Sequence, residues 1–457
     1  MDRDAPATAG EEARRLAKLA LPLVAVHAGS QVAAFVDMVF VGRLPATQIA
    51  AYGIGSGALF AVVAFGMGCV FGIEALASQA VGAGERVLAR RSLWQGVRIA
   101  LVLSVPIMAA ILLIPRLVAL AGVESATVAE IGRYLLGRLP GIPAFLVATA
   151  CRAYLQAEGA TRPIVFSMLV FNAVNLALDA MLIHGDRTLL ALGLAPIGLP
   201  ALGVLGCGLA SAVSATVGLT VLALGIRGLE CPPDADRRKL HPELMRSALR
   251  LGIPFGGQGA ADAGGFAMLA TMAGRIGAEA AAAYSVAISW GALTYTISYG
   301  IGSATSVRVG WFVGRGDTPS ARRAGLVGLA CGAVFMACAG IVFFTAGGPL
   351  ARLLTDKAAV AAAAVPLLAI AALFQISDGT NAIATGALRG AGDTRSPFLA
   401  MLIGVYGVAV PAAWYFAFRT GLGGEGLWWG ATIGLSAAAI ILFTRFWLLS
   451  RRHIERV

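Results

Sequence analysis

The sequence has 457 residues, of which 58% are hydrophobic and 13% are charged. A soluble domain usually carries about twice that share of charged residues. The mean hydropathy of +0.81 indicates more apolar surface than one soluble core can bury. The net charge of +11 does not indicate a nucleic-acid partner, because the basic residues lie in short connections where they set membrane topology. We therefore expect a membrane protein whose partners are the lipid bilayer and small molecules.

Apolar stretches long enough to cross a ~30 Å hydrocarbon layer as helices recur along the whole chain. They are continuous and rich in Ala, Leu, Val and Gly, which favours helices over the alternating strands of a closed β-barrel. The sequence predicts an all-α polytopic fold with about twelve transmembrane helices. Their expected positions are 16–41, 50–80, 93–121, 131–157, 163–184, 199–226, 246–273, 281–313, 322–347, 359–389, 396–418 and 425–449.

Basic residues cluster in alternate connections and near both ends of the chain. The positive-inside rule then places both termini in the cytoplasm, as an even number of spans requires. The predicted domains are a cytoplasmic tail at 1–15, a six-helix bundle at 16–226, a cytoplasmic linker at 227–245, a second bundle at 246–449 and a tail at 450–457.

The two halves of the chain resemble each other at a nearly fixed offset. The first matched residues are 232 positions apart (254 − 22). Matches at this offset are Pro22 with Pro254, Gly42-Arg43 with Gly274-Arg275, and Ala51-Tyr52 with Ala283-Tyr284. Six spans per copy make the repeats parallel, and a central cleft between two such bundles suits alternating access. A channel can also be built from repeats, so this pattern favours a transporter, and a channel stays an alternative.

Five acidic residues lie in the predicted spans away from loop ends, where an ionisable group usually faces a cavity, an ion or a partner. They are Asp37, Glu74, Asp179, Asp262 and Asp378, and His27 is the one basic candidate identified beside them. Asn175 lies four residues before Asp179, on the same helix face. Oxygen atoms of these residues suit Na⁺ or an exchangeable proton. The alternative is structural: hydrogen-bonded acids near an interface, or a buried polar pair.

Other polar and aromatic residues in the spans either line a cleft or join helices. The substrate-cleft candidates are Gln31, Glu74, Gln258, Tyr284, Trp290 and Gln375. The sequence has no GxxxxGK[ST] phosphate-binding loop, so ATP is not the direct energy source. It has no nucleophile–base set or HExxH motif, so we expect neither an enzyme nor a cofactor beyond the coupling ion. The six cysteines have no metal-ligand spacing and are expected to be inert.

Several motifs, in order along nearly the whole chain, resemble those of the MATE family (multidrug and toxic compound extrusion transporters). They are the end of the first span from Asp37 to Gly42, the stretch from Gly72 to Ala83, the stretch from Arg152 to Pro163, and Gln375-Ile376-Ser377-Asp378 followed by the stretch from Leu388 to Thr394. The resemblance implies a V-shaped pair of six-helix bundles in a bacterial inner membrane. It also implies a monomer that exports organic cations in antiport with H⁺ or Na⁺.

The resemblance also implies coupling residues. In the first bundle, the family's cation site matches Asp37, Asn175 and Asp179, with a helix-6 hydroxyl at Ser211. In the second bundle its acids match Asp262 and Asp378, and Na⁺ is possible at either set. Two positions depart from the family pattern. Asp262 stands where the bacterial multidrug-efflux branch of the family usually has Glu, and Tyr284 stands where many members have His.

Other classes of membrane protein share some of these features. A major-facilitator transporter also has six plus six helices, but the span near 359–389 does not carry its motifs. A lipid-linked precursor flippase of the same superfamily would require cationic cleft residues, whereas the acids found here are anionic. A channel would lack coupling, and an enzyme would require a reactive constellation.

Overall fold

The computed structural model describes residues 8–186, 190, 195 and 198–457. These residues form helices and turns, and no strand occurs among them. The first half contains α1 (Ala9–Val41), α2 (Ala46–Phe71), α3 (Ile73–Gly82), α4 (Arg86–Leu120), α5 (Ser125–Arg138), α6 (Gly141–Ala157), α7 (Thr161–His184) and α9 (Val204–Arg227).

The second half begins with α10. It contains α10 (Pro242–Ile276), α11 (Ala278–Gly314), α12 (Thr318–Thr345), α13 (Gly347–Leu354), α14 (Ala358–Gly390), α15 (Arg395–Met401), η1 (Leu402–Ala409), α16 (Val410–Trp414), η2 (Tyr415–Arg419) and α17 (Gly423–Leu449). The segments from α15 to η2 follow one another without a break, with two π-helical stretches.

Each of the twelve predicted spans corresponds to helix in the structure, so the predicted all-α membrane fold is confirmed. Two spans are interrupted. The predicted span 50–80 is divided into α2 and α3 at Gly72, and the span 131–157 bends by 51° between α5 and α6. Pro140 lies at this bend, and its missing N–H removes a hydrogen bond that a continuous helix requires.

Among the described residues, nine helical segments are long and apolar enough to cross a bilayer, and the bent α5–α6 pair makes a tenth. The remaining long helices are α10, with 35 residues, and α11, with 37. Both exceed the length needed to cross ~30 Å. They are less apolar because α10 contains five charged residues and α11 is rich in Gly, Ser and Thr. The chain is a multi-pass membrane protein.

The chain folds into two compact units that interleave along the sequence. The first unit comprises Ala25–Ile73 and Arg86–Gly256. The second unit comprises Glu74–Glu85, Gly257–Val457 and the described residues up to Val24. The predicted bundles, 16–226 and 246–449, are consecutive stretches of sequence, whereas each compact unit combines separate segments. The two bundles stay a prediction about the arrangement in the membrane.

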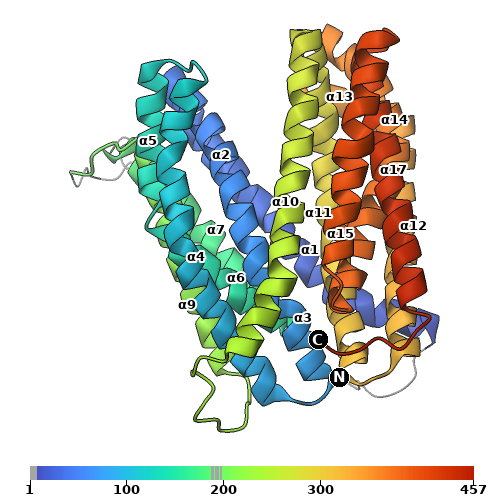
Figure 1. Cartoon of the computed structure of the whole chain (residues 1–457). Helices are drawn as coiled ribbons and strands as arrows, with labels where there is room; N and C mark the ends of the chain where they lie inside the picture. The colour runs from blue at the N-terminus through green and yellow to red at the C-terminus, as the bar shows by residue number, and fades with distance from the viewer. Residues whose placement is uncertain (1–7, 187–189, 191–194, 196–197) are drawn as a thin grey trace. The chain divides into compact units, whose positions relative to one another are not determined.

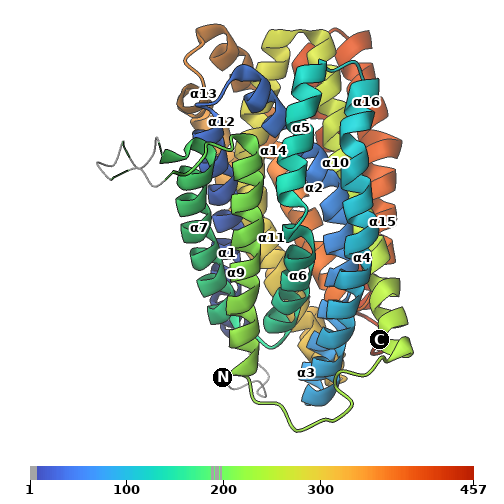
Figure 2. The same cartoon turned by 90° about the vertical axis from the view of Figure 1, so that its left-hand side faces the viewer.

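Within the first unit, α9 packs against α5, α6 and α7, and α4 packs against α6 (Figure 2). Within the second unit, α14 is central and packs against α11, α12 and α17 (Figure 1). The core of this second unit includes Trp428 of α17, whose ring meets those of Phe374 at 5.2 Å and Tyr284 at 6.0 Å between centroids. Each unit thus has its own helical core.

Candidate ion-coupling and substrate sites

Two predicted carboxylates come together in the first unit. Asp37 lies on α1, four residues before its end, and Asp179 lies on α7, five residues before its end. Both are buried, with 8% and 0% of their surface exposed. One carboxylate oxygen of each lies within 4.8 Å of one oxygen of the other and of the Cys207 sulfur on α9. The structure therefore brings the two predicted carboxylates together, with a thiol beside them.

Each carboxylate in this cluster is held through one oxygen. Asn175 donates from Nδ2 to Asp179 Oδ2 over 3.0 Å, across one turn of α7. The Tyr52 hydroxyl of α2 donates to Asp37 Oδ2 over 3.4 Å. The Oδ1 atoms of Asp37 and Asp179 are buried and accept no hydrogen bond. Arg138, at the end of α5, interacts electrostatically with both carboxylates. Two buried acceptors beside one cation suit a proton or a small metal ion.

The fourth predicted member, Ser211, is buried on α9, four residues after Cys207 and therefore on the same helix face. Sequence reasoning missed Cys207, because spacing rules for metal ligands compare neighbours in sequence. The cluster takes its members from three helices that are far apart in the chain. A cysteine within the first turn of α9, facing two intramembrane acids, is a signal visible only once the helices are paired.

Asp262 on α10 and Asp378 on α14 both belong to the second unit. Asp378 is 6% exposed, whereas Asp262 is partly buried. The two carboxyl groups interact electrostatically. Tyr295 of α11 interacts with both of them. The structure therefore places the second predicted acid pair near one another, in the unit that contains α11 and α14.

Three cleft candidates of the second unit use their polar groups to connect helices. Gln258 donates to the Thr385 hydroxyl over 3.3 Å, and Gln375 donates to the Thr294 hydroxyl over 2.5 Å. The Trp290 ring nitrogen donates to the Leu350 carbonyl over 3.1 Å. These contacts fit the structural alternative, in which such residues join helices.

The other two aromatic and amide candidates differ in exposure. Tyr284 is 4% exposed, and its ring packs against Trp428, while its hydroxyl has no hydrogen-bond partner. Gln31 of α1 is exposed on the first unit. Neither location by itself assigns a substrate contact.

Glu74 is fully buried on α3 and forms an ion pair with Arg389 of α14 at 3.4 Å. Arg389 also donates to the Ser306 hydroxyl over 3.2 Å. A second buried pair joins Glu12 of α1 to Arg308 of α11 at 2.5 Å. The prediction of His27 as the one intramembrane base is therefore incomplete. Both arginines lie near span ends, where the positive-inside rule assigned them to loop clusters.

The predicted polar tail at 1–15 overlaps the start of α1. The helix α1 already begins at Ala9, and Glu12 is 2% exposed. Its carboxylate is satisfied by the guanidinium of Arg308, which removes the cost of burying a lone charge. Polar residues near the start of the chain thus belong to a packed helix.

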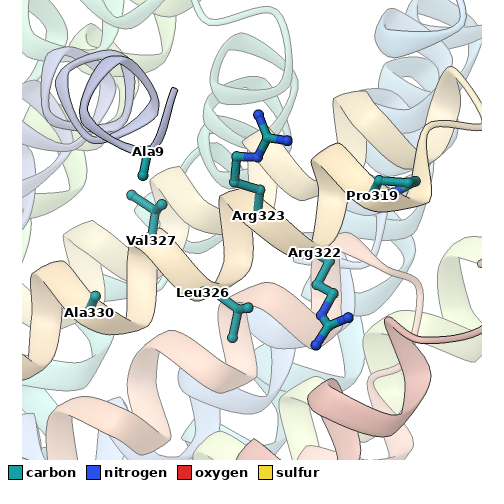
Figure 3. Close-up of a pocket in the computed structure, with 7 residues that line it drawn as sticks. All are labelled: Ala9, Pro319, Arg322, Arg323, Leu326, Val327 and Ala330. Carbon is teal, nitrogen blue, oxygen red and sulfur yellow. The ribbon is translucent and has the colours of Figure 1, made fainter. Parts of the chain in front are cut away.

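An open groove of about 360 Å³ lies in the second unit, between the start of α1 and α12. It is lined by Ala9, Pro319, Arg322, Arg323, Leu326, Val327 and Ala330. Figure 3 shows Arg322 and Arg323 leaving α12 on different sides, with Leu326 and Val327 one turn further on. None of the predicted coupling or cleft residues lines this groove.

Comparisons with known proteins show the family and the fold of the chain. The MatE family model matches residues 22–181 and 260–415, one match in each predicted half. The probable multidrug resistance protein NorM of Bradyrhizobium diazoefficiens is 33% identical over 446 residues, covering 96% of this chain and 93% of that protein. The multidrug resistance protein NorM of Burkholderia vietnamiensis is 31% identical over 455 residues, covering 97% and 96%.

Solved structures share the fold. The eukaryotic MATE transporter AtDTX14 superposes with a TM-score of 0.83 at 22% identity, over 97% of this chain and 98% of that one. A MOP superfamily transporter from Pyrococcus furiosus superposes with a TM-score of 0.86 at 19% identity, over 96% and 97%. With the family matched in both halves and relatives similar over their full length, the chain belongs to the MatE family of membrane transporters and is not an enzyme.

Proposed function

We propose that the chain is a secondary antiporter that exports organic, amphiphilic cations in exchange for H⁺ or Na⁺. The observation that carries this proposal is the buried cluster of Asp37 and Asp179, in which one oxygen of each carboxylate has no hydrogen-bond donor. The names of the relatives, which are multidrug resistance proteins, support an efflux role.

The coupling follows from the cost of like charges in a buried place. Two carboxylates within 4.8 Å of one another repel strongly where the dielectric constant is low, so at least one takes up a proton or a metal ion. Loading the cluster removes this repulsion and favours closer packing of α1 and α7. Unloading it restores the repulsion and favours the alternative packing. An ion gradient can thereby drive alternating access, with the membrane potential adding about 2.3 kcal/mol per charge per 100 mV.

The second acid pair, Asp262 and Asp378, is proposed as a further site for the coupling ion or for the positive charge of the substrate. Their mutual electrostatic interaction supports this role. The shorter Asp262, in place of the Glu usual in the branch, holds its carboxylate closer to the helix backbone. Anionic groups in a cleft attract cationic amphiphiles by electrostatics.

The proposal also includes the cellular setting. Relatives from bacteria support a location in the bacterial inner membrane. The basic residues of alternate connections support cytoplasmic termini. We propose a monomer, because each unit holds its own carboxylate pair within a single chain.

The test is efflux of a fluorescent organic cation from proteoliposomes under an imposed pH gradient or an imposed Na⁺ gradient, each alone. We expect one gradient to drive transport, and Asp37→Asn or Asp179→Asn to abolish the driven component. Asp356→Asn, at an exposed position between α13 and α14, is the control and should transport like the unmodified protein. Unchanged driven flux in both cluster variants would contradict the coupling mechanism.

The alternative within the superfamily is a flippase for lipid-linked precursors. Absence of flux under either gradient, across a panel of organic cations, combined with movement of a lipid pyrophosphate between leaflets, would favour it over antiport.

A further inference from the structure

A cysteine thiol lies among the carboxylates of the first unit. Cys207 is fully buried, and its sulfur is within 4.8 Å of one oxygen of Asp37 and one of Asp179. An oxygen-only cluster is what H⁺ or Na⁺ requires, so the thiol adds a chemical capacity that neither ion uses. Thiolate together with carboxylate oxygen is a ligand set for soft or borderline divalent cations.

Two of the metal-ligand atoms have no hydrogen-bond partner. Asp37 and Asp179 each use Oδ2 to accept a hydrogen bond, from Tyr52 and from Asn175 respectively. Each leaves Oδ1 buried without a donor. Hydrogen bonds to the outer oxygen of a metal-ligating carboxylate orient the inner one. The hydrogen bonds already present therefore fix the two carboxylates in a way that suits coordination through Oδ1.

The distances are compatible with one shared ion. In a tetrahedral zinc site, bonds of about 2.1 Å to oxygen and about 2.3 Å to sulfur place two ligand atoms about 3.4–3.6 Å apart. The three atoms already lie within 4.8 Å of one another, so side-chain rotations that shorten the longest separation by at most about 1.3 Å suffice. We propose that Asp37, Asp179 and Cys207 form a binding site for a soft divalent cation of the Zn²⁺ or Cd²⁺ class.

Charge and position also favour this site. Two carboxylates and one thiolate carry three negative charges, and Arg138 is a positive group that interacts with them. A divalent cation brings the net charge of the cluster close to neutral. Binding displaces the thiol proton, which leaves to solvent as the metal–sulfur bond forms. Asp37, Asp179 and Cys207 all lie within five residues of a helix end, about 8 Å along a helix.

The experiment is a titration of the purified full-length protein in detergent with Cd²⁺ as the probe. Binding is measured by calorimetry and by the ultraviolet charge-transfer band of the cadmium–thiolate bond. We expect one Cd²⁺ per chain and a band that appears with it. Cys207→Ser should remove the band and weaken binding at least tenfold. Asp179→Asn should weaken binding at least tenfold while the residual complex keeps a thiolate band.

Two control variants separate this site from other thiols. Cys69 and Cys151 are also buried in the first unit but are not members of the cluster, so Cys69→Ser and Cys151→Ser should bind Cd²⁺ like the unmodified protein. If Cys207→Ser does not fold, Cys207→Ala replaces it. A band that persists without Cys207, or binding that is indifferent to both aspartates, overturns the proposal.

The titration requires no gradient and no organic substrate. If the protein showed no gradient-driven efflux, the Cd²⁺ titration could still succeed. If Cd²⁺ did not bind, coupling to H⁺ or Na⁺ would be unaffected. The two proposals can therefore fail separately.

Discussion

At the scale of single residues, membrane burial made some functional groups readable from the sequence and concealed others. Asp37 and Asp179 were predictable, because an acid within an apolar span is costly and conspicuous. Arg308 and Arg389 were not recognised, because an arginine near the end of a span looks like a topology signal. Their partners, Glu12 and Glu74, are 296 and 315 residues away in the chain. Only the fold shows that each base neutralises a buried acid.

The buried pair of Arg389 and Glu74 gives a stability prediction. Arg389→Ala leaves the carboxylate of Glu74 buried without its guanidinium, which typically costs about 3–5 kcal/mol. We expect a clear drop in the thermal unfolding temperature in detergent. The double variant Arg389→Ala with Glu74→Gln should regain part of that loss, because no charge remains buried.

The control for this prediction is an exposed pair. Arg133 and Glu130 lie one turn apart on α5, and the Arg133 side chain is 64% exposed. Surface pairs of this kind contribute about 0–1 kcal/mol, so Arg133→Ala should leave the unfolding temperature nearly unchanged. Equal effects of Arg389→Ala and Arg133→Ala would show that the buried pair does not stabilise the protein.

At the scale of helices, glycines allow α2 and the first part of α10 to approach closely within the first unit. A Cβ at Gly252 would overlap the backbone carbonyl of Cys69, and one at Gly68 would overlap the backbone of Gly256. Small residues at helix interfaces are how membrane helices pack without large side chains between them. The sequence indicated glycine-mediated packing in general terms, but it did not indicate which helices meet.

This contact predicts a position-dependent effect of adding one methyl group. Gly252→Ala forces two backbones apart, and overpacking of this kind costs about 1–3 kcal/mol. Gly259→Ala, two turns later on the same helix, meets no atom within 4 Å and should be neutral or slightly stabilising. Thermal unfolding of both variants in the same detergent checks this. A destabilised Gly259→Ala with an unaffected Gly252→Ala would contradict the described interface.

The predicted linker at 227–245 is fastened to α4. Arg91 donates to both carboxylate oxygens of Asp234, over 2.8 and 3.0 Å. Gln95 donates to the Lys239 carbonyl over 3.0 Å, and Arg238 stacks over the Trp94 ring at 4.8 Å. The sequence identified this segment as a basic connection. One of its acidic residues, Asp234, anchors it to Arg91.

The linker anchor predicts a dependence on acid. The hydrogen bonds from Arg91 lower the pKa of Asp234 from its ordinary value of 3.8 to about 2. Because the folded pKa is depressed, the anchoring contribution is present above pH 3.8 and is lost as pH falls from 3.8 towards 2. Pepsin cleavage within the linker should therefore rise over this interval, relative to Asp234→Asn. Parallel cleavage profiles for the two proteins would refute the anchoring role.

At the scale of the whole molecule, composition and periodicity were sufficient for the fold class, the spans and the duplication. The hydropathy of a span depends only on its own residues, so hydropathy identified the individual helices well. It missed the break at Gly72 and the assignment of α3 to the second unit. That assignment depends on distant contacts, such as those of Glu74 with Arg389 and of Gln79 with the Gly390 carbonyl. Cys207 was missed for the same reason.

The end of the chain gives a prediction at this scale. The Ile454 N–H donates to Thr318, the Val457 N–H donates to Gln79, and Arg456 pairs with Glu85, which lowers the pKa of that carboxyl. Residues 454–457 therefore fasten the α3–α4 connection within the second unit. Removing residues 452–457 should speed amide hydrogen exchange in α3, whereas exchange in α9 of the first unit stays constant. Unaltered exchange in α3 would disprove this fastening role.

The interleaving of the two units has a consequence for synthesis in the cell. The segment Glu74–Glu85 belongs with residues that follow Gly257, and its acid Glu74 finds its counter-charge 315 residues later. At a translation rate of about 5–20 residues per second, that interval lasts roughly 15 to 60 seconds. During this time the newly made segment lacks its packing partners, and Glu74 lacks the arginine with which it forms an ion pair. The nascent second unit therefore cannot mature in the order in which it is made, and its completion depends on the last helices to leave the ribosome.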